Sequence, residues 1–427
     1  MLAARVAATL SALGPFSPRP HLAVALSGGA DSMALTLLAH AWAQANNGRI
    51  TALTIDHALR AESRHEAEQV AAWMKERGID HHILTPHHTS DSNNLQESAR
   101  IWRYAALASF CRKEGILHCL VAHNAGDNRE TVAHNIARGE TADGASGMGS
   151  ARNVNGVRFL RPLLVTERAD LEDFLRAEHA PWVNDPSNQN TQFARVRVRQ
   201  ALQADAGRVE ELDRMIRTQS AARTARDHAL AVAAVQCVTI SPLGFAEIDV
   251  NAWSTLEPTL ASQLLADCLV TIGGQTNRPR AGETARLVEA LQQTTLQKRT
   301  LAGCEITVHG NSLRIAREAA RVAAPMILSG DGSTGWDGRF TIRHALPETL
   351  ALTLRALGAD GQKQLRTLAP HTAQRMLPSS TPSIWHLDEM LFVPHIGMPE
   401  EKQHSVTIGF TPAKPLAAAA FWCLNTH

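Results

Sequence analysis

The sequence lacks the features that mark several common classes of protein. Its six cysteines lie far apart and form no Cys-x-x-Cys pair, which excludes a zinc ribbon and a thioredoxin-like redox site. No apolar run reaches the ~18–20 residues of a membrane-spanning helix, which excludes an integral membrane protein. There is also no excess of one charge, because 42 Lys and Arg face 41 Asp and Glu. A polyanionic partner would therefore have to bind where charge is locally clustered.

What is present indicates a protein of several modules. A chain of 427 residues, 44% of them hydrophobic, can bury more than one core, so two or three domains are expected. The scattered thiols make a disulfide scaffold implausible and fit a reducing environment, so we expect a cytoplasmic protein. The Ala-rich start of the chain is compatible with a short transit peptide or with an amphipathic first helix that ends near Gly14, and we favour the helix.

Short apolar runs alternate with helical patterns between residues 21 and 137. Strands are expected at residues 21–26, 50–56, 80–85 and 117–123, and helices at 32–45, 62–77, 94–111 and 127–137. Strands separated by helices of this length pair in parallel, so we predict an α/β fold with a doubly wound, mostly parallel sheet. Such a sheet binds its ligand beyond the carboxyl ends of its strands.

Beyond residue 199 the strand pattern fades. Helices are expected at residues 208–234, 256–272 and 282–292, a hairpin at 304–315 and a linker at 319–335. The remainder is rich in β-forming residues and is punctuated by prolines. We therefore predict three domains, namely an α/β domain at 1–205, a mostly helical domain at 206–318 and a small α+β domain at 319–427.

A glycine-rich turn at residues 27–32 (SGGADS) joins the first predicted strand to a helix. Gly28 and Gly29 have no Cβ, so the backbone can turn sharply and present N–H groups to an anion. The following helix N-terminus also favours negative charge, and the two serine hydroxyls can donate to the same oxygens. Asp31 can cap the helix or bind a metal ion that bridges phosphates. The turn lacks the Gly-Lys-Ser/Thr of P-loop proteins, so a different kind of phosphate site is predicted.

These motifs resemble a known enzyme family. Ser-Gly-Gly-x-Asp-Ser after a first strand resembles the signature of the PP-loop ATP pyrophosphatases, which use ATP and release pyrophosphate. Within that superfamily, the chain resembles the tRNA(Ile)-lysidine synthetases in the order of further motifs, which are Ile55–Arg60 (IDHALR), Asn94–Arg100 (NLQESAR), His123–Thr131 (HNAGDNRET), Arg161–Leu164 (RPLL) and the run from Asp185 to Arg199. The chain departs from the family pattern at Gly126, Asn128 and Val196, where an aspartate, a glutamine and an asparagine are usual.

The resemblance implies a ligase that joins L-lysine to C2 of the wobble cytidine of tRNA(Ile) with a CAU anticodon. ATP first adenylates the cytidine, and pyrophosphate and then AMP leave. The lysine amine, whose pKa is about 10.4, must lose a proton before it attacks, so the site needs a carboxylate. Asp127 and Glu130 stand three residues apart at a predicted helix start and share one face. We assign Asp127 as the base and Glu130 as the lysine clamp, although two solvated carboxylates in a first helical turn would give the same pattern.

The remaining candidates concern ATP, Mg²⁺ and RNA. His123 is expected to orient the base or donate to a phosphate, with a purely structural role as the alternative. Mg²⁺ is expected on the pyrophosphate, and arginine's planar fork suits phosphate oxygens. The ATP-binding candidates are Ser27, Gly28, Gly29, Ala30, Asp31, Ser32 and Asp56, and Asp31 is also the metal candidate. The catalytic candidates are Asp127, His123 and Arg195, and the candidates for phosphate or tRNA binding are Arg100, Arg103, Arg197 and Arg199. A basic stripe is expected at Arg208, Arg214, Arg217, Arg223 and Arg226.

Three other functions stay open on the sequence. A PP-loop enzyme that thiolates tRNA usually needs paired cysteines, and a small-molecule amidotransferase would need a glutaminase nucleophile; neither feature is visible. A non-catalytic nucleotide-binding or RNA-binding protein is the third, and the change at Gly126 keeps it in consideration. The sequence does not predict the oligomeric state, a homodimer included.

Overall fold

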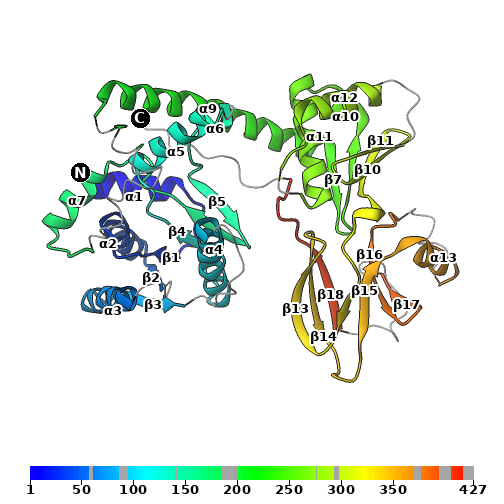
Figure 1. Cartoon of the computed structure of the whole chain (residues 1–427), viewed down its shortest axis with the longest axis horizontal. Coiled ribbons are helices and arrows are strands. Elements are labelled where there is room, and N and C mark those ends of the chain that lie inside the picture. Colours follow the sequence, from blue (N-terminus) through cyan, green and yellow to red (C-terminus); the bar gives the residue numbers. More distant parts are fainter. Residues whose placement is uncertain are drawn as a thin grey trace. The chain divides into compact units, whose positions relative to one another are not determined.

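The computed structural model describes residues 1–56, 61–85, 95–139, 142–183, 198, 201–202, 204–275, 277–292, 298–368, 377–393 and 405–416. Side chains are described at these positions except 61–63, 95–100, 142–143, 292, 368 and 405. The chain divides into two compact units, which comprise Met1–Asp227 and His228–Ala418 (Figure 1). Within the described ranges, no helix combines the length and the apolar character needed to cross a bilayer.

The first unit is built on a six-stranded sheet with the order β3-β2-β1-β4-β6-β5 (Figure 1). All neighbours pair in parallel except β5 and β6. Its elements are α1 (Leu2–Ala12), β1 (His21–Ala25), α2 (Ala30–Ala45), β2 (Arg49–Ile55), α3 (Ala61–Glu76), β3 (Asp80–Leu84), α4 (Leu95–Lys113), β4 (His118–Leu120), α5 (Ala125–Ala137), α6 (Ala142–Ala145), β5 (Ala151–Val154), β6 (Val157–Leu160) and α7 (Arg168–Ala177).

The order of this sheet places the loops that matter for function. The chain moves outward from β1 to β2 and β3, and then returns to pair β4 with the other side of β1. Ligands of doubly wound sheets bind where the strand order reverses in this way. The loop after β1 and the loop after β4 therefore leave the carboxyl edge of the sheet from adjacent strands.

Apolar side chains cover the two faces of the sheet. One cluster joins α1, α2, α3 and α7 to the sheet, through residues such as Leu10, Met33 and Leu171. The other lies under α4 and includes Leu107 and Phe159. Strands buried on both faces need continuous apolar runs, which explains the HLAVA sequence of β1.

The second unit follows a long helix, α9 (Ala206–Cys237), which begins in the first unit. Its first part packs helices on an antiparallel sheet with the order β7-β8-β11-β10-β9, and its second part has two sheets, β12-β15-β16-β17 and β13-β14-β18. The elements are β7 (Val238–Ser241), β8 (Phe245–Asp249), α10 (Val250–Ser254), α11 (Pro258–Gly273), α12 (Ala281–Gln292), β9 (Lys298–Leu301), β10 (Cys304–His309), β11 (Ser312–Arg317), η2 (Ala319–Arg321), β12 (Met326–Leu328), β13 (Asp331–Trp336), β14 (Phe340–Ala345), β15 (Leu352–Ala356), α13 (Gly358–Leu368), β16 (Pro382–His386), β17 (Glu389–Phe392) and β18 (Ser405–Phe410).

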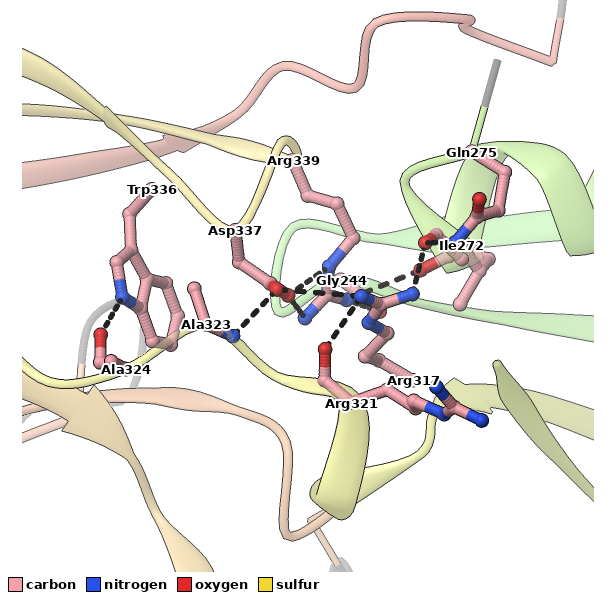
Figure 2. A network of polar contacts seen from close by, with 11 residues as sticks. Gly244, Ile272, Gln275, Arg317, Arg321, Ala323, Ala324, Trp336, Asp337 and Arg339 are labelled. Atoms are coloured by element: carbon pink, nitrogen blue, oxygen red, sulfur yellow. Dashed lines mark hydrogen bonds and ion pairs between the residues drawn. The ribbon is translucent and has the colours of Figure 1, made fainter. Parts of the chain in front are cut away.

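A buried ion pair ties the two parts of the second unit together (Figure 2). Arg339 lies in the turn between β13 and β14, and its Nε donates to Asp337 at 2.7 Å. Its Nη1 donates to the carbonyl of Gly244, between β7 and β8, at 3.1 Å, and to that of Ile272, in α11, at 3.3 Å. Arg317 lies 3.7 Å from Asp337 and donates to the carbonyls of Gly273 and Arg321. The last residues of α11 are thus joined to the turn of a later hairpin.

The α/β prediction is confirmed, and each predicted element between residues 21 and 137 is present with shifted ends. The predicted helices of the middle region are also present, as is the hairpin at residues 304–315, but β7 and β8 were not predicted. The linker prediction is wrong at residues 326–328, which form β12 and pair with β15, and at residues 331–335, because this glycine-rich segment belongs to β13 and pairs along its length with β14. The three-domain division stays a prediction.

Candidate active site

The glycine-rich turn lies between β1 and α2, where it was expected. Gly28 has a φ of +83°, a conformation that residues with a side chain rarely adopt. A Cβ at Gly28 would also lie 2.9 Å from Cγ2 of Val70 and 3.2 Å from Cγ2 of Val183. Gly29 differs, since it caps α2 with a φ of −70° and a Cβ there would meet nothing closer than 3.7 Å. The turn therefore requires glycine at Gly28 for both conformation and space.

Two serines hold the turn in shape. Ser32 Oγ donates to the carbonyl of Gly29 at 2.9 Å and accepts from the backbone N–H of Ser27 at 3.2 Å. The two hydroxyl oxygens are 3.1 Å apart. The first-turn N–H groups of a helix have no helical acceptor, so the start of α2 offers donors and a positive dipole end at this turn. This arrangement suits a phosphate group.

Asp31 is a largely buried carboxylate in the first turn of α2. Its Oδ1 has no hydrogen-bond partner among the described residues, and its Oδ2 lies 3.9 Å from Nη1 of Arg168. Burial raises the pKa of Asp31, and the nearby Asp127 carboxylate raises it further. Arg168 and a hydrogen bond from the Asn124 side chain oppose that rise in pKa. A cation placed beside Oδ1 would complete the interactions of this carboxylate.

Asn124 joins the start of α5 to the start of α2. Its side-chain oxygen accepts from the N–H of Asp127 at 3.0 Å, while the Asp127 carboxylate accepts from the N–H of Asn124 at 3.1 Å. This reciprocal pair is a capping box, which satisfies two backbone donors at a helix start. Asp127 therefore has a structural role in addition to the catalytic role predicted for it. Asn124 and Asp127 both act on the pKa of Asp31, so the start of α5 lies near the start of α2 and the two carboxylates form one cluster.

The other residues of the predicted lysine site lie on α5 or just before it. Glu130 is buried one turn after Asp127, and His123 is half-buried in the loop that follows β4. Asn128 accepts from the N–H of Met148 at 2.7 Å through its Oδ1, so the residue that replaces the usual glutamine holds the loop before β5. At Gly126, a Cβ would lie 3.2 Å from the capping oxygen of Asn124.

Asp56 directly follows β2 and is buried, with its Oδ2 3.8 Å from Nη1 of Arg64. Since β2 pairs with β1, Asp56 leaves the same carboxyl edge of the sheet as the glycine-rich turn. The adenosine or metal role predicted for Asp56 stays a prediction.

The predicted arginines are placed unevenly. Arg103 is exposed on α4, with its guanidinium 5.9 Å from the centre of the Tyr104 ring. Arg100 lies on α4, but its side chain is outside the described residues, as are Arg195, Arg197 and Arg199 entirely. On α9, three of the five arginines lie within 4.0 Å of acidic side chains, which are Arg208 with Glu211 and Arg223 and Arg226 with Asp227. Arg214 and Arg217 are exposed three residues apart, and the basic stripe stays a prediction.

Sequence reasoning did not find the residues that join these helices. Arg129 is nearly buried and pairs with Glu167 before α7 and with Asp213 of α9, at 2.7 Å from the latter. Arg168 begins α7 and faces Asp31. The only sequence feature that could have indicated these contacts is the charged pair Glu167-Arg168 after the RPLL motif. Nothing in the local sequence indicates that α7 packs against α2.

The fold and this turn define the class of protein. A family described as "PP-loop domain" matches residues 2–206, which contain the sheet, the glycine-rich turn and the carboxylate cluster. Proteins named tRNA(Ile)-lysidine synthase are similar over most of the chain. One from Orientia tsutsugamushi is 30% identical, covering 93% of this chain and 95% of the relative, and one from Ruegeria pomeroyi is 32% identical, covering 90% and 91%. One from Wolbachia pipientis wMel is 32% identical over 75% of this chain and 76% of the relative.

The chain belongs to the tRNA(Ile)-lysidine synthase family. The resemblance seen in the sequence motifs is thereby confirmed, although the roles of individual site residues are not tested by it.

Proposed function

We propose that this protein is an ATP-dependent ligase that attaches L-lysine to C2 of the wobble cytidine of tRNA(Ile) with a CAU anticodon. The products are lysidine in the tRNA, AMP and pyrophosphate. The observation that carries the proposal is the proximity of Asp31, in the glycine-rich turn after β1, to Asn124 and Asp127, which follow the adjacent strand β4 at the same carboxyl edge of the sheet. One loop suits a triphosphate and the other offers carboxylates to an amine.

The two half-reactions divide between these loops. At the glycine-rich turn, backbone N–H groups and the Ser27 hydroxyl hold the phosphates, while the cytidine O2 attacks the α-phosphorus and pyrophosphate leaves. At α5, Glu130 holds the ammonium group of lysine and Asp127 accepts its proton. The neutral amine then attacks C2, and the C2–O bond to AMP breaks. Glu130 is suited to the clamp because burial strengthens its attraction to a cation.

The residues present fit Mg²⁺ bound together with a nucleotide. Mg²⁺ usually takes one or two carboxylates with phosphate oxygens and water, and Asp31 has a buried oxygen with no hydrogen-bond partner among the described residues. Asp31 would hold the ion, which when bound supplies charge neutralisation for the triphosphate. The described side chains include no group of three or more potential metal ligands, which agrees with a metal that arrives with ATP.

Label transfer tests the proposal directly. The full-length protein is incubated with ATP, Mg²⁺, radiolabelled lysine and a tRNA(Ile) transcript that carries CAU. We expect label in this transcript and none in a matched transcript with uridine at the wobble position. Absence of label from a folded protein that binds ATP would overturn the proposal. ATP-dependent thiolation of the same transcript would instead support the thiolase function.

A further inference from the structure

The guanidinium of Arg168 lies beside the glycine-rich turn. Arg168 is the first residue of α7, and its Nη1 is 3.9 Å from Oδ2 of Asp31 in the first turn of α2. This separation is too long for a hydrogen bond, although it is within ion-pair range. The Arg168 side chain is 43% exposed, so it can be reached by a ligand. Asp31 therefore does not use the hydrogen-bonding capacity of this guanidinium.

The position of Arg168 is nevertheless well defined. Its Nε donates to Glu172 one turn along α7 at 2.9 Å, so this bond does not use the Nη groups. Just before α7, the carbonyl of Thr166 accepts from the N–H of Ala125 at 3.0 Å, and Glu167 pairs with Arg129 of α5. The start of α7 is thus fastened to the start of α5, while buried Leu171 and its neighbours pack α7 on α2.

Arg168 lies between Glu172, which accepts from its Nε, and Asp31, which is within ion-pair range of its Nη1. Asp31 and Asp127 are two carboxylates that raise each other's energy, and Arg168 is the cation that offsets this. A guanidinium that served Asp31 alone would gain most from a direct two-point contact, which is the strong geometry for arginine and a carboxylate. Here the guanidinium lies 3.9 Å from Asp31, in the first turn of α2, and makes no such two-point contact.

We propose that Arg168 binds the pyrophosphate half of ATP. This inference rests on the proposed function, because it requires the triphosphate to occupy the glycine-rich turn. Two N–H groups of the guanidinium would donate to β- or γ-phosphate oxygens. When the cytidine O2 bonds to the α-phosphorus, the bond from that phosphorus to the β-bridging oxygen breaks and its electron pair leaves with pyrophosphate. Arg168 stabilises this negative charge without giving up a proton, since arginine stays protonated.

Variants of two arginines on the same helix test the inference. Arg168→Ala removes the guanidinium, Arg168→Lys keeps the charge without the planar fork, and Arg176→Ala is the matched control. Arg176 is also exposed and also contacts Glu172, at 3.3 Å, but its other partner is Asp173 and not Asp31. Calorimetry on the full-length protein, without tRNA, would measure affinity for ATP, AMP and inorganic pyrophosphate.

We expect Arg168→Ala to weaken ATP and pyrophosphate about 10-fold or more, with AMP changed by less than about 2-fold. Arg168→Lys should lie between, and Arg176→Ala should resemble the wild type. Equal weakening of ATP and AMP, or unchanged ATP affinity, would overturn the inference, because a purely structural role for Arg168 does not distinguish the two nucleotides. Melting temperatures confirm that each variant is folded.

A double variant separates phosphate binding from neutralisation of Asp31. If Arg168 only offsets the Asp31 charge, Asp31→Asn should restore pyrophosphate affinity to the Arg168→Ala protein when Mg²⁺ is left out. We expect no such recovery, and recovery would count against the inference. Failure of the proposed function would look different, since the wild type itself would then transfer no lysine, whatever Arg168 does.

Discussion

Each unit contains an arginine–aspartate cluster, and the two clusters differ in how closely the charges are paired. We call the Arg339–Asp337 cluster of the second unit the closed cluster, and that of Arg168, Asp31 and Asp127 in the first unit the open cluster. In the second unit, the side chains of Arg339 and Asp337 are 0% and 3% exposed and lie 2.6 Å apart, and two backbone carbonyls accept hydrogen bonds from Arg339. In the first unit, Arg168 and Asp31 are 43% and 22% exposed and stay 3.9 Å apart. A buried charge without close partners costs free energy, so a fold keeps one only where something else benefits. The close pairing of Arg339 with Asp337 indicates a structural role, and the wider separation of Arg168 from Asp31 indicates a binding role.

The largest effect should come from the open cluster. Asp127→Asn keeps a side-chain oxygen that can accept from the N–H of Asn124, so the capping box and α5 should survive. An amide cannot accept the lysine proton, and general-base catalysis is worth about 10²–10⁴-fold. We therefore expect lysine transfer to fall at least about 100-fold while the affinity for ATP changes little. Single-turnover transfer at saturating lysine measures this, and an unchanged rate would remove Asp127 from its catalytic role.

Variants of the closed cluster should change the free energy of unfolding. Arg339→Met leaves Asp337 buried without its close cation, and breaking a buried ion pair from one side costs about 3–5 kcal/mol. Urea denaturation followed by tryptophan fluorescence suits this test, because Trp336 is buried beside the pair. Arg343→Ala, at an exposed position of β14, is the control and should cost less than about 0.5 kcal/mol.

Adding Asp337→Asn to Arg339→Met removes the stranded charge and keeps an acceptor for the N–H of Ala323. Part of the lost stability should return. If the single and double variants were equally unstable, the charge pair would not be the cause.

Two adjacent glycines of the turn should also differ in how much a substitution destabilises the protein. Gly28→Ala would place a Cβ 2.9 Å from Val70 in a backbone conformation with a φ of +83°, and such strain costs about 1–3 kcal/mol. Gly29→Ala meets nothing closer than 3.7 Å at an ordinary φ, so its cost should stay under about 1 kcal/mol. Denaturation of both variants without nucleotide measures the difference, and equal stabilities would contradict the geometry of the turn.

The sequence predicted local features well and contacts between distant segments poorly. The turn at residues 27–32 was predicted because its glycines and serines act within the turn itself, through the backbone at Gly28 and the hydroxyls of Ser27 and Ser32. The facing of Arg168 and Asp31 was not, since it depends on the packing of α7 on α2. The β7–β8 hairpin was missed because it follows a 32-residue helix without a marked break. The glycine-rich segment at residues 330–335 (GDGSTG) favours a linker because glycine is rare in strands, yet its pairing with β14 uses backbone groups alone. For Arg195, Arg197 and Arg199 no comparison applies, as they lie outside the described residues.

The smallest expected effect concerns the free-energy cost of keeping the open cluster charged. Burial raises the pKa of Asp31 above the value it has in the unfolded chain, so near neutral pH the ionised carboxylate is less favourable in the folded protein than in the unfolded one. Asp31→Asn should therefore stabilise the protein at neutral pH, by about 0.5–1 kcal/mol. As the pH falls through the raised pKa of Asp31 toward about 4, the wild-type carboxyl becomes neutral and the advantage of the variant should disappear. Denaturation at several pH values, with Asp173→Asn at an exposed position of α7 as the control, measures this difference. A variant less stable than the wild type at neutral pH would mean that the Asp31 charge, with Arg168 standing back from it, helps to hold the fold.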